Sequence, residues 1–491
     1  MSLVPRQTDA EIIIVGAGFA GLGMAIRLKR AGLHSFLVLE RAADVGGTWR
    51  DNVYPGCACD IPTALYSFSF ERNAAWTRVF PRQGELLEYL RRCAARYGIL
   101  AHIRFRTQLA GARFDAQRGI WTVRSSDGRA FESRILIAAM GPLSKPNVPY
   151  IGGAERFAGA AFHSAQWDRS VNLRGKRVAV IGTGASAVQI VPEIAPLAER
   201  LTVYQRTPPW IIPRGDRAVT PAQRLRLRLF PGYAWLRRKL LYWMLEFRAL
   251  GFTVMPSLLK TQERAALRFL EKEIAEPQLR AMLVPGYRMG CKRVLLSDDY
   301  YATLRRANVE VVTEPIAAIE EAAIRTADGA ERAADVIVYA TGFRATEGVA
   351  PVRIEGAAGR ELGEEWRDGM QAYLGTSVAG FPNLFLLVGP NTGLGHNSMV
   401  LMMEAQYRYV LDALRFMRRG KVRALDVRRS EQAAFNARLQ ARMRRTVWSS
   451  GCSSWYIDAG GKNTTLWPGF TFSYRWLTRR FVPARYALTP E

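Results

Sequence analysis

Two stretches of the chain share one pattern of apolar and polar positions. Each has a short run of mostly β-branched residues, a glycine-rich turn, and then apolar residues that recur every three or four positions, which predicts a buried strand followed by a helix. A second apolar run follows each helix and predicts a second strand. The stretches are EIIIVGAGFAGLGMAIRLKRAG with HSFLVLE (residues 11–40) and KRVAVIGTGASAVQIVPEIA with RLTVYQR (residues 176–206). The pattern therefore predicts an α/β protein with two Rossmann-like dinucleotide-binding domains.

The two glycine turns carry the first candidate chemistry. They consist of Gly16, Gly18 and Gly21 in the first stretch and of Gly182, Gly184 and Ala187 in the second, and both fit the G-x-G-x-x-G/A fingerprint. In this fingerprint the first glycine permits a tight turn, the second lets the backbone approach a pyrophosphate, and the third position lets helix and strand pack closely. The unpaired N–H groups and the dipole of the helix N-terminus favour the phosphate charge. Each turn therefore predicts a dinucleotide site.

The residue that ends each second strand distinguishes the two cofactors. Glu40 lies about twenty residues beyond the first turn, where an acid binds ribose hydroxyls and repels a 2′-phosphate. The first site therefore suits FAD or NAD, and its N-terminal position favours FAD by resemblance to flavoproteins with two dinucleotide sites. Arg206 stands at the corresponding position of the second site, where a guanidinium pairs with the 2′-phosphate of NADPH. The alternative for Arg206 is an arginine that begins a solvated loop. FAD and NADPH together predict hydride transfer from nicotinamide to flavin.

Changes of pattern along the chain predict five segments. Three prolines (Pro142, Pro146 and Pro149) follow the first unit and mark a boundary. Helical patterns rich in arginine and aromatic residues fill residues 213–285, and ADVIVYATGF is similar to segments that return a chain to its FAD domain. The predicted segments are residues 1–145 (FAD domain, first part), 146–212 (NADP domain, first part with linker), 213–285 (helical insert), 286–339 (NADP domain, second part) and 340–491 (FAD domain, second part, with a C-terminal loop of the substrate pocket).

The helical insert has two open interpretations. Its apolar face is expected to cover the active site and exclude water. The alternative is a basic amphipathic helix pair that contacts a membrane surface or a partner. Two residues in a later glycine-rich loop are also open, because His396 and Asn397 could lie beside the flavin or cap the long helix that follows.

Composition narrows the class of protein. The chain has 491 residues and a net charge of +26, but its arginines are spread along the sequence, so we expect a solvated basic surface and no nucleic-acid partner. Five cysteines without a C-x-x-C pair predict a reducing, cytoplasmic location with neither a disulfide framework nor a zinc site or other metal. No run of about 20 apolar residues that could span a bilayer is visible.

Three irregular segments hold the remaining candidate residues. GGTWRDNVYPGCACD (residues 46–60) is too dense in glycine and proline for a helix or a strand, and is expected to be a loop. Lys292 and Arg293 stand together before an apolar run, and Trp455 lies in a segment near the end of the chain. Further cofactor-binding candidates within or beside these motifs are Thr48, Gln189 and Thr207.

The whole chain resembles the type I Baeyer–Villiger monooxygenases, which are class B flavoprotein monooxygenases. The resemblance rests on Phe157, Gly159, His163, Trp167 and Asp168, which fit the signature F-x-G-x-x-x-H-x-x-x-W-[P/D], and on Gly47, Trp49, Tyr54, Pro55, Gly56 and Asp60, which fit a second signature. N- and S-oxidising flavin monooxygenases share the first three signature positions but usually lack the Trp–Asp ending. By this resemblance Asp60 lies beside the flavin, Lys292 reaches the NADPH phosphate, Arg293 enters the active site, and Trp455 lines the substrate and nicotinamide pocket.

The resemblance also implies a reaction. NADPH reduces FAD, O2 adds to flavin C4a, and the resulting peroxide attacks a small ketone to give an ester or a lactone. Arg293 would stabilise the peroxide anion, and Asp60 would orient Arg293 through a bidentate pair. His163 is expected to act in a hinge that positions the NADP domain, because it lies between the two Rossmann units. Two alternatives stay open: an N- or S-oxidising flavin monooxygenase, and an NADPH-linked flavin reductase without oxygen insertion.

Overall fold

A parallel five-stranded sheet carries the first glycine turn. The computed structural model describes residues 8–349 and 352–491. The strand order is β19-β7-β1-β2-β3, and every neighbouring pair is parallel. Burial on both faces explains the nearly continuous apolar runs of these strands. The strands are β1 (Ile12–Val15), β2 (Phe36–Leu39), β3 (Ile103–Arg104), β7 (Ile135–Ala138) and β19 (Leu384–Leu386).

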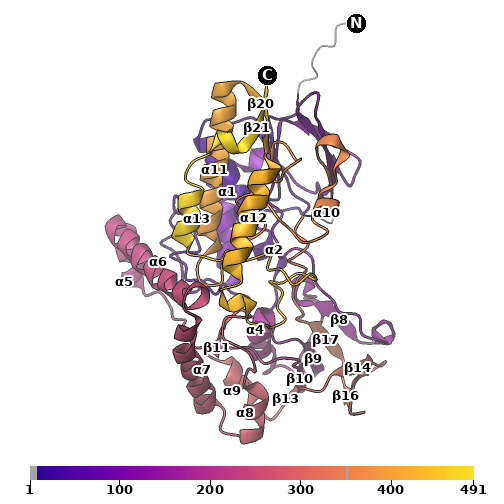
Figure 1. The fold of residues 1–491 in the computed structure, drawn as a ribbon. Helices are drawn as coiled ribbons and strands as arrows, with labels where there is room; N and C mark the ends of the chain where they lie inside the picture. The colour runs from indigo at the N-terminus through magenta and orange to yellow at the C-terminus, as the bar shows by residue number, and fades with distance from the viewer. Residues whose placement is uncertain (1–7, 350–351) are drawn as a thin grey trace.

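A second parallel sheet repeats this arrangement around the second glycine turn. Its order is β13-β10-β9-β17-β8, and the strand before the glycine turn again lies at the centre. Only one outer strand differs in chain order, because β8 precedes β9 whereas its counterpart β19 follows β1. The strands are β8 (Ala160–His163), β9 (Arg177–Ile181), β10 (Arg200–Tyr204), β13 (Val309–Val312) and β17 (Val336–Tyr339). Two Rossmann-like cores were predicted from the repeated pattern, and the structure has both of them, in the upper and the lower half of Figure 1.

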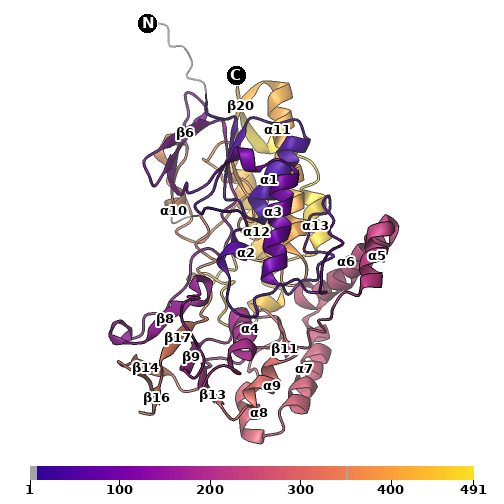
Figure 2. The same ribbon diagram turned by 180° about the vertical axis from the view of Figure 1, so that it is seen from behind.

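Helices cover the first sheet on the side away from the small antiparallel strands. The helix after the first glycine turn, α1 (Phe19–Arg30), packs between α3 (Gln83–Arg96) and α11 (Met399–Gly420), as Figures 1 and 2 show from opposite sides. The corresponding helix of the second unit is α4 (Ala185–Ile194), which contacts α9 (Tyr300–Leu304). Both glycine-turn helices are thus held by tertiary packing as well as by their own sequence.

Smaller elements surround the two sheets. A hairpin with an Asp-Gly turn, Asp127 and Gly128, is formed by β5 and β6, and it joins β4 and β18 in a mixed sheet. The bounds are β4 (Leu109–Asp115), β5 (Ile120–Ser125), β6 (Ala130–Ser133), β18 (Arg353–Glu355), β11 (Ile211–Ile212), β12 (Leu295–Leu296), β14 (Ile316–Ile319), β15 (Ala323–Thr326), β16 (Glu331–Ala333), β20 (Val422–Val427), β21 (Tyr486–Pro490), α10 (Leu362–Glu365), α12 (Arg429–Met443) and α13 (Thr471–Leu477).

The helical insert extends from the side of the molecule. It contains α5 (Pro221–Leu229), α6 (Pro231–Thr253), α7 (Leu259–Glu273) and α8 (Pro277–Leu283), and α5 and α6 project at the left of Figure 1. The inner face of α6 is buried at Tyr242, Leu245, Glu246, Ala249 and Phe252. In the described part of the chain, no helix is long and apolar enough to cross a membrane.

The two chain crossings between the sheets lie side by side. One leaves the first sheet after β7 through the proline-rich linker, and the other returns after β17. Asn147 N–H donates to Gly342 O (2.9 Å), Arg344 N–H donates to Lys145 O (3.0 Å), and Thr341 Oγ1 donates to Asn147 O (2.6 Å). The crossings are therefore paired by hydrogen bonds into a single connection between the two halves.

Two expectations from the sequence are wrong. The loop at residues 46–60 contains a one-turn helix, α2 (Thr48–Asp51), which begins directly after two glycines with positive φ, Gly46 and Gly47. The cysteines do form one disulfide, because Cys291 and Cys452 are paired across 161 residues with a Cα–Cα distance of 6.1 Å. Local spacing rules detect neighbouring cysteine pairs, whereas this pair is brought together by the fold. Cys57, Cys59 and Cys93 are free and buried.

Candidate active site

One large cavity runs between the two sheets. Its volume is about 2070 Å³, and both glycine turns line it. This volume is roughly twice the upper end of the ~1,000 Å³ typical of a pocket for one drug-sized ligand. Among the described residues, every predicted cofactor-binding residue lines the cavity except Gly21 and Ala187, which are buried behind it. The cavity therefore has room for two dinucleotides and the residue set to hold them.

The first glycine turn fits a pyrophosphate. Gly16 has a φ of 103°, and a Cβ there would come within 2.6 Å of Ala139 O. A Cβ on Gly21 would overlap Gly16 O, so this glycine lets α1 pack against the turn. The open side of Gly18 faces the cavity at the N-terminus of α1 and meets only Gly47, at 3.6 Å. The turn thus presents backbone N–H groups and a helix dipole where the phosphates of FAD would lie.

Glu40 has a second role that the motif does not reveal. Ala17 N–H donates to its Oε2 (2.8 Å), Ala42 N–H donates to its Oε1 (3.0 Å), and Arg50 Nη1 lies 2.9 Å from Oε1. The carboxylate is buried but borders the cavity. Glu40 therefore holds the glycine turn and Arg50 in place, and could accept ribose hydroxyls only through the lone pairs that these bonds leave.

The second glycine turn repeats the geometry of the first. Gly182 has a φ of 112°, and a Cβ there would lie 2.6 Å from Ala340 O. A Cβ on Gly184 would meet nothing within 4 Å, so this side of the turn is open to the cavity. Thr183 Oγ1 donates to Thr207 O (2.9 Å) and holds the segment after β10 beside the turn. The fit is that of a second pyrophosphate site.

Two cations lie together at the second site. Lys292 and Arg206 both line the cavity, and burial together with the charge of Arg206 lowers the pKa of Lys292. The ammonium of Lys292 also lies 5.0 Å from the centre of the Tyr287 ring. Two like charges held this close repel each other, and an anion between them would remove the repulsion. This pair could hold a 2′-phosphate.

Gln189 joins the two halves of the cavity. It lies on α4 of the second unit, but Tyr54 Oη and Ala58 N–H both donate to its Oε1 (3.1 and 3.3 Å), and its Nε2 donates to Ala58 O (3.0 Å). Trp49 is held in turn by a bond from its Nε1 to Tyr66 Oη (3.2 Å). The side chain of Gln189 therefore attaches the loop at residues 46–60 to the NADP half.

Asp60 and Arg293 form an ion pair inside the cavity. Nε and Nη2 of Arg293 donate to the same oxygen, Asp60 Oδ2, at 2.8 and 2.5 Å, so the arginine uses two donors and the carboxylate one oxygen. The charge of Asp60 raises the pKa of Arg293 above its ordinary value, with burial acting in the opposite direction. About 30% of each side chain is accessible. The arginine is thus permanently charged, fixed in direction and open to a ligand.

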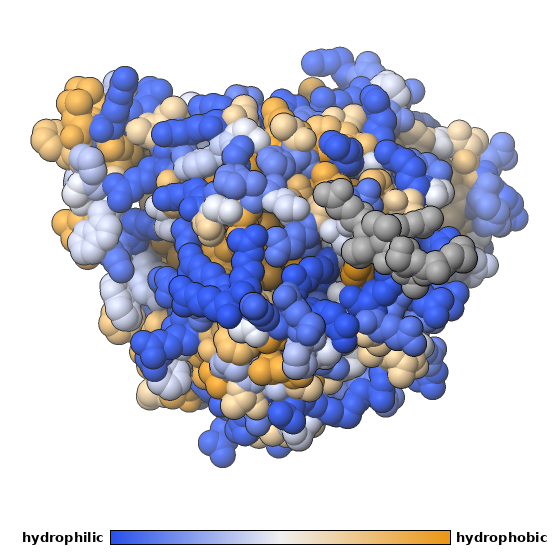
Figure 3. Space-filling model, turned by 90° about the horizontal axis from the view of Figure 1, so that it is seen from above, coloured by the Kyte–Doolittle hydropathy of each residue, from blue (hydrophilic) through white to orange (hydrophobic). Residues whose placement is uncertain are grey.

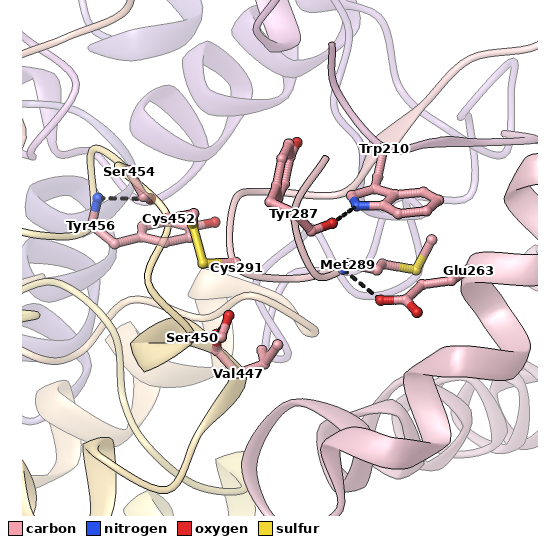
Figure 4. Close-up of a disulfide and its surroundings, with 10 residues drawn as sticks. All are labelled: Trp210, Glu263, Tyr287, Met289, Cys291, Val447, Ser450, Cys452, Ser454 and Tyr456. Atoms are coloured by element: carbon pink, nitrogen blue, oxygen red, sulfur yellow. Dashed lines mark hydrogen bonds between the residues drawn. A yellow bond between two sulfur atoms is a disulfide. The ribbon is translucent and has the colours of Figure 1, made fainter. Parts of the chain in front are cut away.

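The disulfide connects this arginine loop to the C-terminal segment. Cys291 directly precedes Lys292 and Arg293, and Cys452 stands three residues before Trp455 (Figure 4). Trp455 is 43% exposed, lines the cavity and contacts Tyr456 with ring centroids 4.4 Å apart. In Figure 4 the sulfur atoms of Cys291 and Cys452 join the two loops, between the insert and the C-terminal ribbon. No local spacing of the cysteines indicates this link.

The residues that define the signature at 157–168 do not line the cavity. Phe157 and the carbonyl of Asp335 crowd Gly159, where any side chain would clash. Trp167 packs edge-on against Phe162 (5.1 Å), and Asp168 accepts hydrogen bonds from Ser170. The neighbouring Ala165 and Gln166 do line the cavity. These side chains therefore shape the edge strand β8 and the turn after it.

His163 lies against the paired crossings. It is 1% exposed, Ala165 N–H donates to its Nδ1 (3.1 Å), and its ring meets Phe343 at 5.6 Å. Burial lowers its pKa, and the adjacent backbone of Gly342 opposes that effect. A neutral histidine that touches the returning crossing agrees with a positioning role, and gives no support to a general base.

Sequence reasoning missed a buried polar group between the insert and the long helix. Asn397 Nδ2 donates to Glu246 Oε2 (2.8 Å), and His396 Nε2 lies 3.9 Å from the same oxygen. Asn397 lines the cavity, whereas Ser398 caps α11 by accepting from Val400 N–H. Among the described residues, none of 213–286 lines the cavity, so the insert reaches the cavity wall through contacts such as this one with Asn397. Periodicity alone could not show which face of α6 would be buried.

Comparisons with known proteins place the chain in a family. Residues 13–229 match the sequence profile of the pyridine nucleotide-disulphide oxidoreductases. The chain is 48% identical to a Baeyer–Villiger monooxygenase of Pseudomonas aeruginosa, over 100% of this chain and 94% of that protein. It is 47% identical to a Baeyer–Villiger monooxygenase of Streptomyces coelicolor, over 97% of this chain and 92% of that protein. The chain belongs to the Baeyer–Villiger monooxygenases.

Solved structures agree with this assignment. The monooxygenase superimposes on a steroid monooxygenase bound to NADP with a TM-score of 0.88 and 30% identity, covering 99% of this chain and 100% of the other. It superimposes on a cyclohexanone monooxygenase from Rhodococcus sp. Phi1 bound to NADP+ with a TM-score of 0.89 and 26% identity, at the same coverage. The predicted family, fold class and enzyme class are confirmed.

Proposed function

We propose that this Baeyer–Villiger monooxygenase binds FAD at the first glycine turn and NADPH at the second, and that Arg293 is the residue that directs oxygen insertion. FAD and NADPH are the cofactors of the enzyme, and its reaction places one atom of O2 beside a ketone carbonyl to give an ester or a lactone. The observation that carries the assignment of Arg293 is its ion pair with Asp60 inside the cavity that both turns line. The domain limits given above stay a prediction.

The cofactor-binding roles follow the geometry of the cavity. Gly16, Gly18 and Gly21 would hold the pyrophosphate of FAD, Glu40 would border its ribose, and Thr48, Trp49 and Tyr54 would lie along it toward the flavin. Gly182, Gly184 and Ala187 would hold the pyrophosphate of NADPH, with Gln189, Thr207 and Trp455 beside it. Arg206 and Lys292 would bind its 2′-phosphate, which relieves the repulsion between the two cations.

The protein's own contribution to the chemistry is a fixed charge. Bound FAD, once reduced by NADPH, supplies the activation of O2. Arg293 directs its guanidinium into the cavity and stabilises negative charge that develops on oxygen, and because Asp60 fixes its direction, little reorganisation is needed during the reaction. Asp60 also keeps the guanidinium charged by raising its pKa. His163 positions the NADP half through the paired crossings and takes no proton from the substrate.

The substrate is a small-molecule ketone, with O2 as the second substrate. The relatives include enzymes named for cyclohexanone and for steroids, and one cyclohexanone monooxygenase structure contains ε-caprolactone. We therefore propose a cyclic ketone as the first class to test. A cytoplasmic location stays a prediction, and the Cys291–Cys452 disulfide weighs against a strongly reducing compartment.

A direct test uses the purified full-length protein. It should show the absorbance of bound FAD, and a cyclic ketone should increase its consumption of NADPH and produce the corresponding lactone. NADH at the same concentration is the control and should support less turnover. Stimulation only by amines or thioethers would favour an N- or S-oxidising enzyme, and NADPH oxidation without any oxygenated product would favour a plain flavin reductase.

A further inference from the structure

The outer face of the α5–α6 hairpin exposes an unusual number of large apolar side chains. Phe247 is 66% exposed, Leu240 64% and Phe230 59%, although α6 is otherwise packed against the body of the protein. Figure 3 shows hydrophobic side chains gathered on a projection at its left edge, the side on which Figure 1 shows α5 and α6. We call these residues the α5–α6 apolar face: Leu225, Leu229, Phe230, Tyr233, Trp235, Leu236, Leu240, Trp243, Met244 and Phe247.

The α6 part of this face contains a continuous stripe and not a scatter of single residues. Leu236, Leu240, Trp243 and Phe247 recur at spacings of four, three and four, which places them on one side of the helix, opposite the buried Tyr242 and Ala249. The stripe continues onto α13, because Trp243 lies 6.3 Å from Phe472, and Trp476 of α13 is 58% exposed. A contiguous exposed patch of this kind marks a surface that binds something.

The charge around the stripe is one-sided. The stretch of residues 221–253 contains seven basic residues and one acidic residue. The acid, Glu246, is buried, and one of the basic residues, Arg238, turns its guanidinium inward to the carbonyls of Ala64 and Ser67. The basic residues are Arg224, Arg226, Arg228, Arg237, Arg238, Lys239 and Arg248. Two cations border exposed tryptophans: Lys239 lies 5.7 Å from the Trp235 ring and Arg479 lies 4.6 Å from the Trp476 ring. Cations and tryptophans at the edge of an apolar stripe suit the boundary between lipid headgroups and acyl chains.

We propose that the α5–α6 apolar face docks this protein on the surface of an anionic lipid bilayer. The leucines and aromatic rings would enter the boundary between headgroups and acyl chains while the arginines contact lipid phosphates. A second copy of the chain fits less well, because two identical basic faces would repel each other. Nucleic acid would use the cations but would leave the leucines in water. The bilayer satisfies both features of the face.

Docking would bring the bilayer close to the cavity. The buried side of the same helix carries Glu246, which accepts a hydrogen bond from Asn397, and Asn397 lines the cavity. One helix thus separates the proposed membrane surface from the cavity wall. An apolar ketone dissolved in the bilayer would then be available near the enzyme, although docking itself does not depend on the reaction.

Vesicle binding by the full-length holoprotein tests the proposal. Vesicles of phosphatidylcholine with about one third phosphatidylglycerol should carry the protein in flotation, whereas vesicles of phosphatidylcholine alone should carry at least about fivefold less, since each basic residue near an anionic surface adds about one kcal/mol. The double variant Leu240→Glu/Phe247→Glu should reduce partitioning at least about tenfold. A matched control, Leu100→Glu/Leu488→Glu, alters two exposed leucines elsewhere (45% and 42% exposed) and should bind like the wild type.

The outcomes separate the proposal from its rivals. FAD content and NADPH consumption should be the same in all three proteins, which shows that the variants fold. No flotation of the folded wild type would overturn the proposal, as would equal losses in the double variant and the control. A wild-type dimer in sedimentation that the double variant lacks, without vesicle binding, would assign the face to a second copy. Binding of DNA in preference to the vesicles would assign it to nucleic acid.

Discussion

A single guanidinium connects the two halves of the active site. Arg293 comes from the loop after the insert, and its partner Asp60 comes from the loop of the FAD half, so the ion pair forms only when both loops are in place. Arg206 and Lys292 form a second cationic position on the same side of the cavity. These two positions give distinct predictions, one for oxygen insertion and one for the choice of cofactor.

Arg293→Ala should abolish ester formation and spare flavin reduction. The variant removes the charge that stabilises developing negative charge on oxygen, and loss of one such donor typically lowers turnover by about 100- to 1,000-fold. Anaerobic reduction of the flavin by NADPH and lactone yield under air measure the two steps separately. Arg293→Lys is the matched control and should recover part of the yield, because it keeps the charge without the two-donor contact to Asp60. Lactone formation at the normal rate in Arg293→Ala would refute the role.

Arg206→Ala should weaken discrimination between NADPH and NADH. A charge-assisted contact to the 2′-phosphate is worth about 1.5–3 kcal/mol, so the KM for NADPH should rise roughly 10- to 100-fold while the KM for NADH stays the same. Steady-state kinetics with both cofactors provides the measurement. Arg174→Ala, at an exposed arginine of the same half that does not line the cavity, should change neither value. A parallel rise in both KM values would instead indicate damage to the fold.

The sequence predicts which residues form the site more readily than it predicts the contacts those residues make. The glycines were predictable because positive φ and close backbone approach leave no other choice, as at Gly16 and Gly182. The pairing of Asp60 with Arg293 was expected through the family resemblance, but its geometry, with two donors on one oxygen, depends on how the two loops meet. Glu40 was expected at the ribose, and its three bonds to Ala17, Ala42 and Arg50 were not visible in the motif.

At the scale of elements, the loops were harder to predict than the sheets. The strands and helices of both glycine-turn units follow from their apolar periods, whereas the one-turn α2 forms between glycines whose conformations no period encodes. The insert was correctly expected to be helical, but one face of α6 is exposed because the body of the protein covers only the other. The Cys291–Cys452 link is likewise a product of tertiary folding.

The disulfide should stabilise the arginine loop together with the C-terminal segment. A cross-link that closes a long loop typically contributes about 2–4 kcal/mol, because it restricts the unfolded chain. Cys452→Ser should therefore lower the temperature of thermal unfolding and raise the KM for NADPH, since Lys292 directly follows Cys291. A reducing agent supplies the control: it should lower the unfolding temperature of the wild type and leave that of Cys452→Ser unchanged. Equal sensitivity of both proteins to the reducing agent would contradict the prediction.

At the scale of the whole molecule, two copies of one folding unit face each other across a cavity. Each sheet has the strand that precedes its glycine turn at the centre, and both turns line the same cavity. Paired crossings at Asn147 and Gly342 connect the halves, and His163 packs against the returning one. The repeat of the folding unit could be predicted from the sequence. The pairing of the crossings could not, because its hydrogen bonds join residues nearly 200 positions apart. Two further links join the halves: the hydrogen bonds of Gln189 to the loop at residues 46–60, and the disulfide between Cys291 and Cys452.

Acid should destabilise the whole molecule through His396, which is buried in the loop before α11, beside Glu246 of the insert. Burial lowers the pKa of His396 to about 4, from an ordinary value of about 6.5. The unfolded chain therefore binds a proton at His396 as the pH falls below about 6.5, whereas the folded protein does so only near pH 4. The contribution of His396 to the free energy of unfolding is thus full above pH 6.5 and is lost as the pH falls from 6.5 to 4. The loss amounts to about 3 kcal/mol over this range. Urea unfolding at several pH values should show a shallower decline in His396→Gln than in the wild type, while His34→Gln, at an exposed histidine, should decline like the wild type. An equal slope in His396→Gln would show that other groups, and not the burial of His396, set the acid limit.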